Sequence, residues 1–456
     1  MPLRRTILFG SALLLASGIL VTWLVPWRTV SETKLQAMLQ QATGQKVVFS
    51  ISEVGLRESR LNDLRLGGTE SPVLLSEIKV AYALPELWHG HLGHLKLAGL
   101  SLTAHETDRG WQLAGWQPAP TTADKTANAI SWLVPPPLPL QSIELTDSKI
   151  DLQALLWQLN LPVSIAWQQQ PTILSLESLA PQLVSGSHSA IVKRMLARAV
   201  FDPERTAWQG SWSLYDLGIA INGLPPPPPL QAKGSITLDQ QKLAISGAAH
   251  DATKAWALQF NLTRDHTGIR PALLQVPKAA MPFLGGAIRL RDLHWPLDGQ
   301  SALRTNVIAE KLPLETLLQH FTSEEVHGSG TVSGEIPLTR QADGKLLIPE
   351  SVLQTDSAGT IAIPANYFPG DNPQLALLRE ILTDLHYESL SLTVSSDANG
   401  KLQLKVSLAG HNPTVQNGKP VKLNVNLGGD VLGLIDNQLL SIIAPTQLLR
   451  KNHDQK

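Results

Sequence analysis

The sequence contains no cysteine among its 456 residues. This absence excludes a disulfide framework, cysteine-based catalysis and thiolate metal sites. An excess of charge of one sign is also missing, because 37 Lys and Arg stand against 38 Asp and Glu and the net charge is −1. No global field would therefore attract nucleic acid or anionic surfaces, and nucleic acid is not expected as a partner.

Charged residues are scarce at 16%, whereas hydrophobic residues make up 43% and Gly and Pro number 33 and 32. This balance favours short strands and turns over a helical bundle. The chain is also longer than a single hydrophobic core usually grows, about 250 to 300 residues. We therefore expect a repetitive β architecture.

Residues 7–27 contain no charged side chain and are mostly apolar. At about 1.5 Å per residue, about 21 residues cross the ~30 Å hydrocarbon core of a membrane. Arg4 and Arg5 precede the segment, which predicts a cytoplasmic N-terminus and an exported body. The alternative is a cleaved signal peptide with small residues at 16–18. Because the apolar run continues well past residue 18, we expect a single-pass membrane anchor with the body exported.

After residues 7–27, apolar residues first recur at helical spacing and then alternate with polar residues, as in a strand. Ser31 can cap a short amphipathic helix containing Leu35, Met38 and Leu39, and Gly44 can end it. From Val47 onward, apolar and polar residues alternate with period two. The predicted fold is mainly β: a long curled antiparallel sheet that forms a rod or groove, with a few short helices.

Three hairpins are predicted where alternation stops at turn residues and then resumes, at 146–148, 239–241 and 397–400. Two short helices are expected at about residues 312–321 and 373–386, where an apolar side would cap the end of a sheet. The proline tracts 135–139 and 225–229 cannot donate ladder hydrogen bonds. We interpret them as extended connectors.

Polar clusters give little support for chemistry. His89, His91 and His94 could bind a metal, but flanking glycines favour a solvated hairpin end. The glycine-rich stretch 328–334 lacks the Gly-Lys-Ser/Thr ending of a phosphate loop and precedes a strand pattern. The sequence therefore predicts no enzyme, no catalytic residue, no metal site and no cofactor.

The strands instead have one apolar and one polar face, as where Leu404 and Val406 alternate with Lys405. An ordinary sandwich is one explanation, but few helical segments are available to cover so many strands. An open apolar face in water would need an apolar occupant, and acyl chains are the expected one. The candidate lipid-groove residues are Leu95, Leu97, Leu100, Leu102, Ile143, Leu145, Ile236, Leu238, Leu402, Leu404, Val406, Leu408, Val421, Leu423, Val425 and Leu427.

Several segments resemble known proteins. Residues 35–48, 92–102, 108–113 and 142–152 resemble the AsmA-like superfamily. Residues 326–338 and 384–390, and above all 410–427 (GHNPTVQNGKPVKLNVNL), resemble its YdbH-like family.

This resemblance implies a protein anchored by a single pass in a bacterial inner membrane, with its body in the periplasm. It implies a groove in that body along which phospholipid passes between the inner and outer membranes, supporting outer-membrane lipid homeostasis. It also implies a small outer-membrane lipoprotein that adds strands at the C-terminal end. The alternative is an envelope scaffold or assembly factor without lipid conduction. The expected divisions are the anchor at 1–30, an AsmA-like β-groove with the exit helix at 31–134, a middle β region at 135–224, a second β-groove segment at 225–325 and a YdbH-like domain at 326–456.

Overall fold

The structure is a computed structural model, and its described residues lie between 36 and 427. Outside the described part are residues 1–35, 38, 42–44, 56, 68–72, 84, 86–91, 108–109, 114–133, 136–139, 155–156, 187, 221–225, 266–271, 298–300, 322–324, 365–372, 398–399 and 428–456. The chain divides into two compact units, unit 1 (Met1–Ile245) and unit 2 (Ser246–Lys456).

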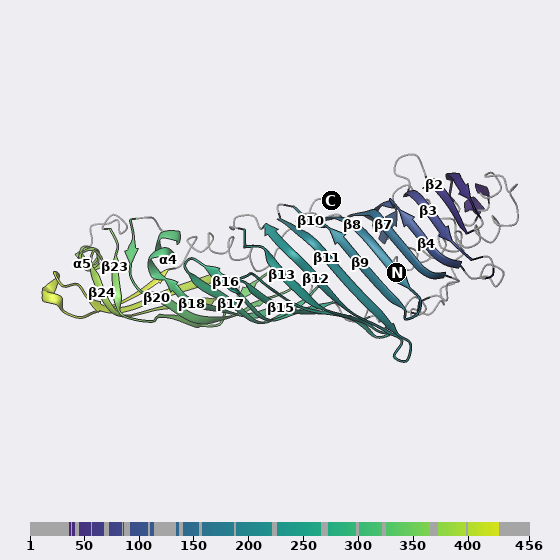
Figure 1. Cartoon of the computed structure of the whole chain (residues 1–456). Helices are drawn as coiled ribbons and strands as arrows, with labels where there is room; N and C mark the ends of the chain where they lie inside the picture. The colour runs from purple at the N-terminus through teal and green to yellow at the C-terminus, as the bar shows by residue number, and fades with distance from the viewer. Residues whose placement is uncertain are drawn as a thin grey trace. The chain divides into compact units, whose positions relative to one another are not determined.

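Strands dominate the described residues, which confirms the mainly β class. Unit 1 contains β1 (Val47–Val54), β2 (Glu58–Leu66), β3 (Val73–Ala81), β4 (Leu92–Ala98), β5 (Ser101–Thr107), β6 (Gly110–Leu113), β7 (Leu140–Gln153), β8 (Gln158–Gln168), β9 (Ile173–Leu179), β10 (Gln182–Ser185), β11 (His188–Asp202), β12 (Ala207–Ala220) and β13 (Leu230–Leu238). The long strands β7 to β9 and β11 to β13 lie side by side (Figure 1). β14 (Lys242–His250) contains the boundary between the units.

The sheet of unit 1 is mixed, which corrects the expected antiparallel arrangement. β4 and β5 both pair in parallel with β7. They behave as one strand interrupted at Gly99 and Leu100: Gly99 N donates to Thr146 O over 3.1 Å, and Lys149 N donates to Leu100 O over 2.7 Å. Two strands that run in the same direction thus share one long partner, an arrangement that local alternation does not specify.

The hairpin predicted at 146–148 is wrong, because β7 runs through these residues without reversing. Asp147 has φ +49°, and the register of β7 on β8 shifts between Leu145 and Ser148. Asp216 and Asp292 repeat the feature in β12 and β17, with φ +51° and +54° beside register shifts. Aspartate tolerates the left-handed region, so each position forms a β-bulge, which bends the strand and increases its twist.

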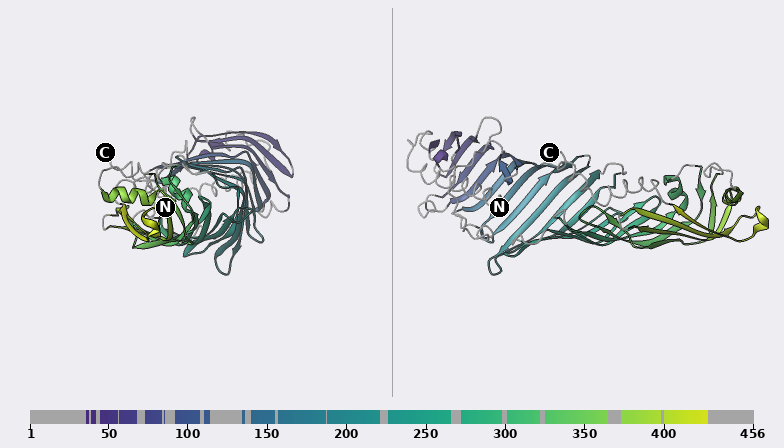
Figure 2. Two further views of the ribbon diagram at one scale, coloured as in Figure 1. Left: turned by 90° about the vertical axis from the view of Figure 1, so that its left-hand side faces the viewer. Right: turned by 180° about the vertical axis from the view of Figure 1, so that it is seen from behind.

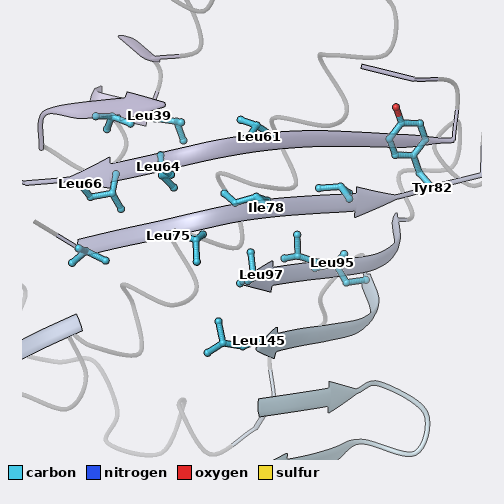
Figure 3. Close-up of a cluster of buried hydrophobic side chains, with 14 residues drawn as sticks. Leu39, Leu61, Leu64, Leu66, Leu75, Ile78, Tyr82, Leu95, Leu97 and Leu145 are labelled. Atoms are coloured by element: carbon cyan, nitrogen blue, oxygen red, sulfur yellow. The ribbon is translucent and has the colours of Figure 1, made fainter. Parts of the chain in front are cut away.

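The hydrophobic core of unit 1 lies on one face of β1 to β4 and β7. Residues 36–37 and 39–41 are helical, and Leu39 packs into this core beside Leu61, Leu64 and Leu66 (Figure 3). The expected exit helix is confirmed for these residues. Ser31, Leu35, Met38 and Gly44 lie outside the described part.

Unit 2 contains β15 (Ala257–Asp265), β16 (Leu273–Phe283), β17 (Gly286–Pro296), β18 (Leu303–Pro313), β19 (His327–Gly328), β20 (Thr331–Arg340), β21 (Leu346–Leu347), β22 (Ser351–Thr355), β23 (Gly359–Ala362), β24 (Leu385–Ser396), β25 (Leu402–His411) and β26 (Val421–Leu427). Its helices are α4 (Leu314–Phe321), α5 (Pro373–Leu382) and the short η2 (Gln416–Gly418). The hairpin predicted at 397–400 is confirmed between β24 and β25, where Asp397 Oδ1 accepts from Lys401 N over 2.8 Å. The turn predicted at 239–241 in unit 1 is confirmed by Asp239 N donating to Lys242 O over 3.0 Å.

The two helices of unit 2 cap its apolar face, as expected from their spacing. Leu314 of α4 and Ile381 and Leu382 of α5 are buried in one cluster with Leu390 and Leu408 of the strands. Figure 2 shows α5 lying over the strands of this unit. α5 ends at Leu382 rather than near 386, because Leu385 begins β24.

Candidate functional site

An apolar row crosses the strands of unit 1. Residues that lie directly opposite each other on paired strands share one face of a sheet. Successive pairings connect one residue from each of β1, β2, β3, β4, β7, β8, β9, β11, β12 and β13, namely Ile51, Leu61, Ile78, Leu97, Leu145, Ile165, Leu176, Ala197, Trp212 and Gly234. No member of this row is polar, so the sheet presents a continuous apolar path from strand to strand.

The row differs in exposure along its course. From Leu61 to Leu145 its members are buried in the core that includes Leu39. From Ile165 through Leu176 to Trp212 they are only half-buried. The part of the row on β8 to β12 is therefore the part that another molecule could contact.

Charged side chains occupy the opposite face and are paired there. Lys96 Nζ lies 2.8 Å from Glu144 Oε2, and this interaction raises the pKa of Lys96. Hydrogen bonds from Lys79 and Arg60 lower the pKa of Glu58. Arg60, Lys79, Lys96 and Glu144 each lie next to a member of the apolar row, so β2, β3, β4 and β7 separate these charges from the apolar face.

A hollow of about 500 Å³ lies over the middle of β7, β8, β9, β11 and β12. Each strand contributes three consecutive residues, and the middle one always belongs to the apolar row: residues 144–146, 164–166, 175–177, 196–198 and 211–213. Trp212 Nε1 donates to Ser235 O over 3.3 Å. The indole N–H is thus satisfied by the sheet while the ring remains part of the apolar surface.

Unit 2 has a row of the same kind. Its pairings connect Met281, Ile288, Ala309, Gly334, Leu353, Leu392 and Val406 on β16, β17, β18, β20, β22, β24 and β25. The register continues from Val406 to Val425 on β26. Leu353, Leu392 and Val406 are half-buried. Each unit therefore has its own apolar row, which runs across the strands of that unit.

Residues 253–441, which include this second row, match a family model described as YdbH-like, intermembrane phospholipid transport protein YdbH. This segment belongs to the YdbH-like family. The resemblance seen in the C-terminal motifs is thereby confirmed. The family is one of lipid transport proteins and not of enzymes. No curated protein and no solved structure matches the chain.

Within the YdbH-like segment, the predicted residues of β25 divide between three environments. Leu402 is buried with Leu338 and Leu346, whereas Leu408 is buried under α4 and α5. Leu404 and Val406, between them, are half-buried. Val421 and Leu423 of β26 pack against the helix-covered cluster, and Val425 and Leu427 are placed by register opposite Val406 and Leu404.

The predicted residues of unit 1 lie mostly in its core. Leu95, Leu97 and Leu145 are buried there, with Leu100 and Ile143 packed against them. Leu102 pairs with Ile150, Ile236 with Gly210, and Leu238 with Trp208.

The half-buried residues Ile165, Leu176 and Trp212 were not predicted. Alternation from Leu159 to Trp167 is clear in the sequence and was the available signal for Ile165.

The glycine-rich stretch of the YdbH-like segment provides space for its neighbours rather than for a phosphate. A Cβ on Gly328 would lie 2.7 Å from Leu318 Cδ1 of α4. Gly330 has φ +98° and lies against the hydroxyl of Tyr387, which donates to Ser329 O over 2.6 Å. Burial raises the pKa of Tyr387. The strand predicted after this stretch is confirmed as β20.

The histidine and membrane predictions fall largely outside the described part. His94 Nδ1 lies 2.6 Å from Ser142 Oγ, whereas His89 and His91 are not described. Among the described residues, no group of three or more potential ligands could hold a metal ion. No helix in the described part is long and apolar enough to cross a membrane, and residues 7–27 lie outside it.

Proposed function

We propose that this chain transports phospholipid between the inner and outer membranes. Acyl chains would lie on the apolar rows of the two units while the head groups stay in water. The observation that carries the proposal is the continuity of each row, in which each strand that the row crosses supplies an apolar residue at the same level of the sheet. The family of residues 253–441 supports the same substrate.

The apolar rows suit a lipid that must be retained by the protein and yet move along it. Each buried methylene is worth about 0.8 kcal/mol, so an acyl chain is strongly retained against escape into water. Neighbouring positions along a row are chemically equivalent, so displacement by one strand exchanges one apolar contact for another. This mechanism is passive and needs no cofactor.

The placement of the protein is part of the proposal. Residues 7–27 would anchor it in the inner membrane, with the body in the periplasm. A small outer-membrane lipoprotein would add strands beside β26, the last described strand, through main-chain hydrogen bonds. The N-terminal span and the helical residues 36–37 and 39–41 would bring lipid to the sheet.

A photo-crosslinking residue placed in the full-length protein in cells tests this function. Ile165 and Leu392 lie on the rows, whereas Asn160 of β8 and Ser391 of β24 are half-buried on the other face and do not line the hollow. Phospholipid adducts at Ile165 and Leu392, with none at Asn160 and Ser391, would support transport. Equal labelling at all four positions, or none, would refute it.

A scaffold role without lipid conduction is the second candidate. The observation that favours it is the cover of α4 and α5 over Leu408 and Leu390, where the sheet packs against its own chain. Under this alternative, Ile165 and Leu392 would give protein adducts rather than lipid adducts.

A further inference from the structure

A second cavity, of about 390 Å³, lies in unit 1 where β8, β9, β11 and β12 reach their turns. Its walls are two aromatic side chains and three prolines: Trp167, Phe201, Pro135, Pro171 and Pro203. Two glutamines and a threonine complete the lining, and none of the described residues that line it carries a charge. We call this cavity the rim pocket.

The rim pocket is held in shape by the backbone. Phe201 N donates to Thr172 O over 2.9 Å, which ties the end of β11 to the turn between β8 and β9. Thr172 Oγ1 donates to Gln169 O over 2.8 Å, which fixes that turn. The Phe201 ring lies 5.4 Å from the ring of Trp208. Prolines have a fixed φ, so much of the wall is ordered before any ligand arrives.

The pocket is continuous with the apolar row. Trp167 lies two residues beyond Ile165 on the same face of β8, and it packs partly against the core of unit 1. Its cross-strand partner is Leu174, which pairs in turn with Ala199, two residues from Phe201. An apolar chain on the row could therefore pass over β8 and β9 into the pocket without crossing a charged side chain.

The volume and lining indicate the chemistry of the ligand. Pockets for small ligands measure about 300–1,000 Å³ and combine apolar walls with a few polar groups. Aromatic rings flanked by amide side chains suit an apolar chain whose other end stays in water. We infer that the rim pocket binds the end of a single acyl chain and is a lateral site through which lipid enters or leaves the row. This inference rests on the proposed function.

Crosslinking at adjacent residues tests the inference in the full-length protein in its membrane. Phe201 lines the pocket, whereas Val200 is equally apolar, 38% exposed and on the opposite face of β11. Ile165 reports separately on the row. We expect phospholipid adducts at Phe201 at least five-fold above Val200.

The outcomes separate the pocket from the row. Lipid adducts at Ile165 without an excess at Phe201 would overturn the inference and leave the proposed function standing. The absence of lipid adducts at Phe201 and Ile165 alike would overturn both. A peptide adduct at Phe201 in place of lipid would assign the pocket to a protein partner and overturn the inference.

A blocking experiment avoids any dependence on folding. Because the chain has no cysteine, Gln170→Cys at the exposed side of the pocket can be labelled with a bulky maleimide after the protein has folded. The label should abolish lipid adducts at Phe201. The same label on Gln209→Cys, an exposed residue of β12, should not change them. Undiminished adducts after labelling at residue 170 would overturn the inference.

Discussion

Replacing Asn412 with alanine should release the C-terminal end of α5. This side chain is 1% exposed. Its Nδ2 donates to Glu380 O over 2.9 Å and to Ile381 O over 3.2 Å, at the end of the helix. Its Oδ1 accepts from Thr414 N and Thr414 Oγ1, both over 2.9 Å. One amide thus donates to two carbonyls at the end of the helix and holds the following turn; Glu380 O also accepts from the Thr383 hydroxyl over 2.7 Å, so Ile381 O depends most on Asn412.

The magnitude follows from these contacts. A hydrogen bond contributes about 0.5–1.5 kcal/mol net, and buried groups left without partners cost about 1–3 kcal/mol. The four bonds share one side chain and do not add fully, so Asn412→Ala should cost about 3 kcal/mol. Since 1.4 kcal/mol corresponds to a factor of ten, α5 amides should exchange with solvent deuterium about 100-fold faster if the loss is local to the helix.

Hydrogen–deuterium exchange on the full-length protein can measure this effect peptide by peptide. The matched control is Asn424→Ala, because Asn424 is exposed on β26 and its loss should change exchange in α5 by less than two-fold. Protection of unit 1 should be the same in both variants. Exchange of α5 that stays within three-fold of the parent in Asn412→Ala would refute the capping argument.

Three further predictions concern the row, the glycine contact and an acidic turn. Leu176→Lys should slow transfer of fluorescent phospholipid between vesicles about 100-fold, because displacing about four methylenes costs about 3 kcal/mol. Gln209→Lys, on the other face of β12 and outside the hollow, should not, and equal slowing would contradict the row. Gly330→Ala should destabilise unit 2 by about 2–4 kcal/mol in denaturant unfolding, since φ is +98° and the Tyr387 hydroxyl fills the space. Tyr387→Phe should recover part of that loss, and no recovery would assign the cost to the backbone alone. Hydrogen bonds from the Thr253 hydroxyl and from backbone N–H groups, including that of Trp256, lower the pKa of Asp251. The turn around Asp251 should therefore be protected from hydrogen exchange at pH values above the ordinary pKa of Asp, and this protection should fall as the pH falls through the lowered pKa. Asp251→Asn should abolish this pH dependence, and a pH dependence that persists in the variant would contradict the prediction.

The local pattern of apolar, polar and turn residues was sufficient to predict much of the fold. Alternation interrupted by Asp239 and by Asp397 correctly predicted turns, and helical spacing correctly placed α4 and α5. The same reasoning failed at Asp147, because aspartate supports a left-handed residue in a turn and in a bulge alike. Whether the strand reverses there depends on β4 and β5, which pair with β7 from distant parts of the sequence.

The candidate site was predictable in kind but not in detail. Apolar residues of β25 were correctly placed on one face, yet the sequence does not show that α4 and α5 cover Leu408 or that Leu402 packs beside Leu338. The rows themselves depend on register between strands, and every bulge shifts that register. Leu176 and Ala197 become neighbours only through pairing across the sheet, which no local spacing encodes.

The pairing of consecutive long strands has a consequence for how such a protein could change in size. A hairpin adds two strands, so a hairpin inserted between β11 and β12 would leave the following chain running in its original direction. β11 and β12 would each still have a neighbouring strand to pair with. At about 4.8 Å per strand, each such insertion would lengthen the path by about 9.6 Å. Length can therefore vary in steps of two strands, so related chains could differ in length by duplication of hairpins alone.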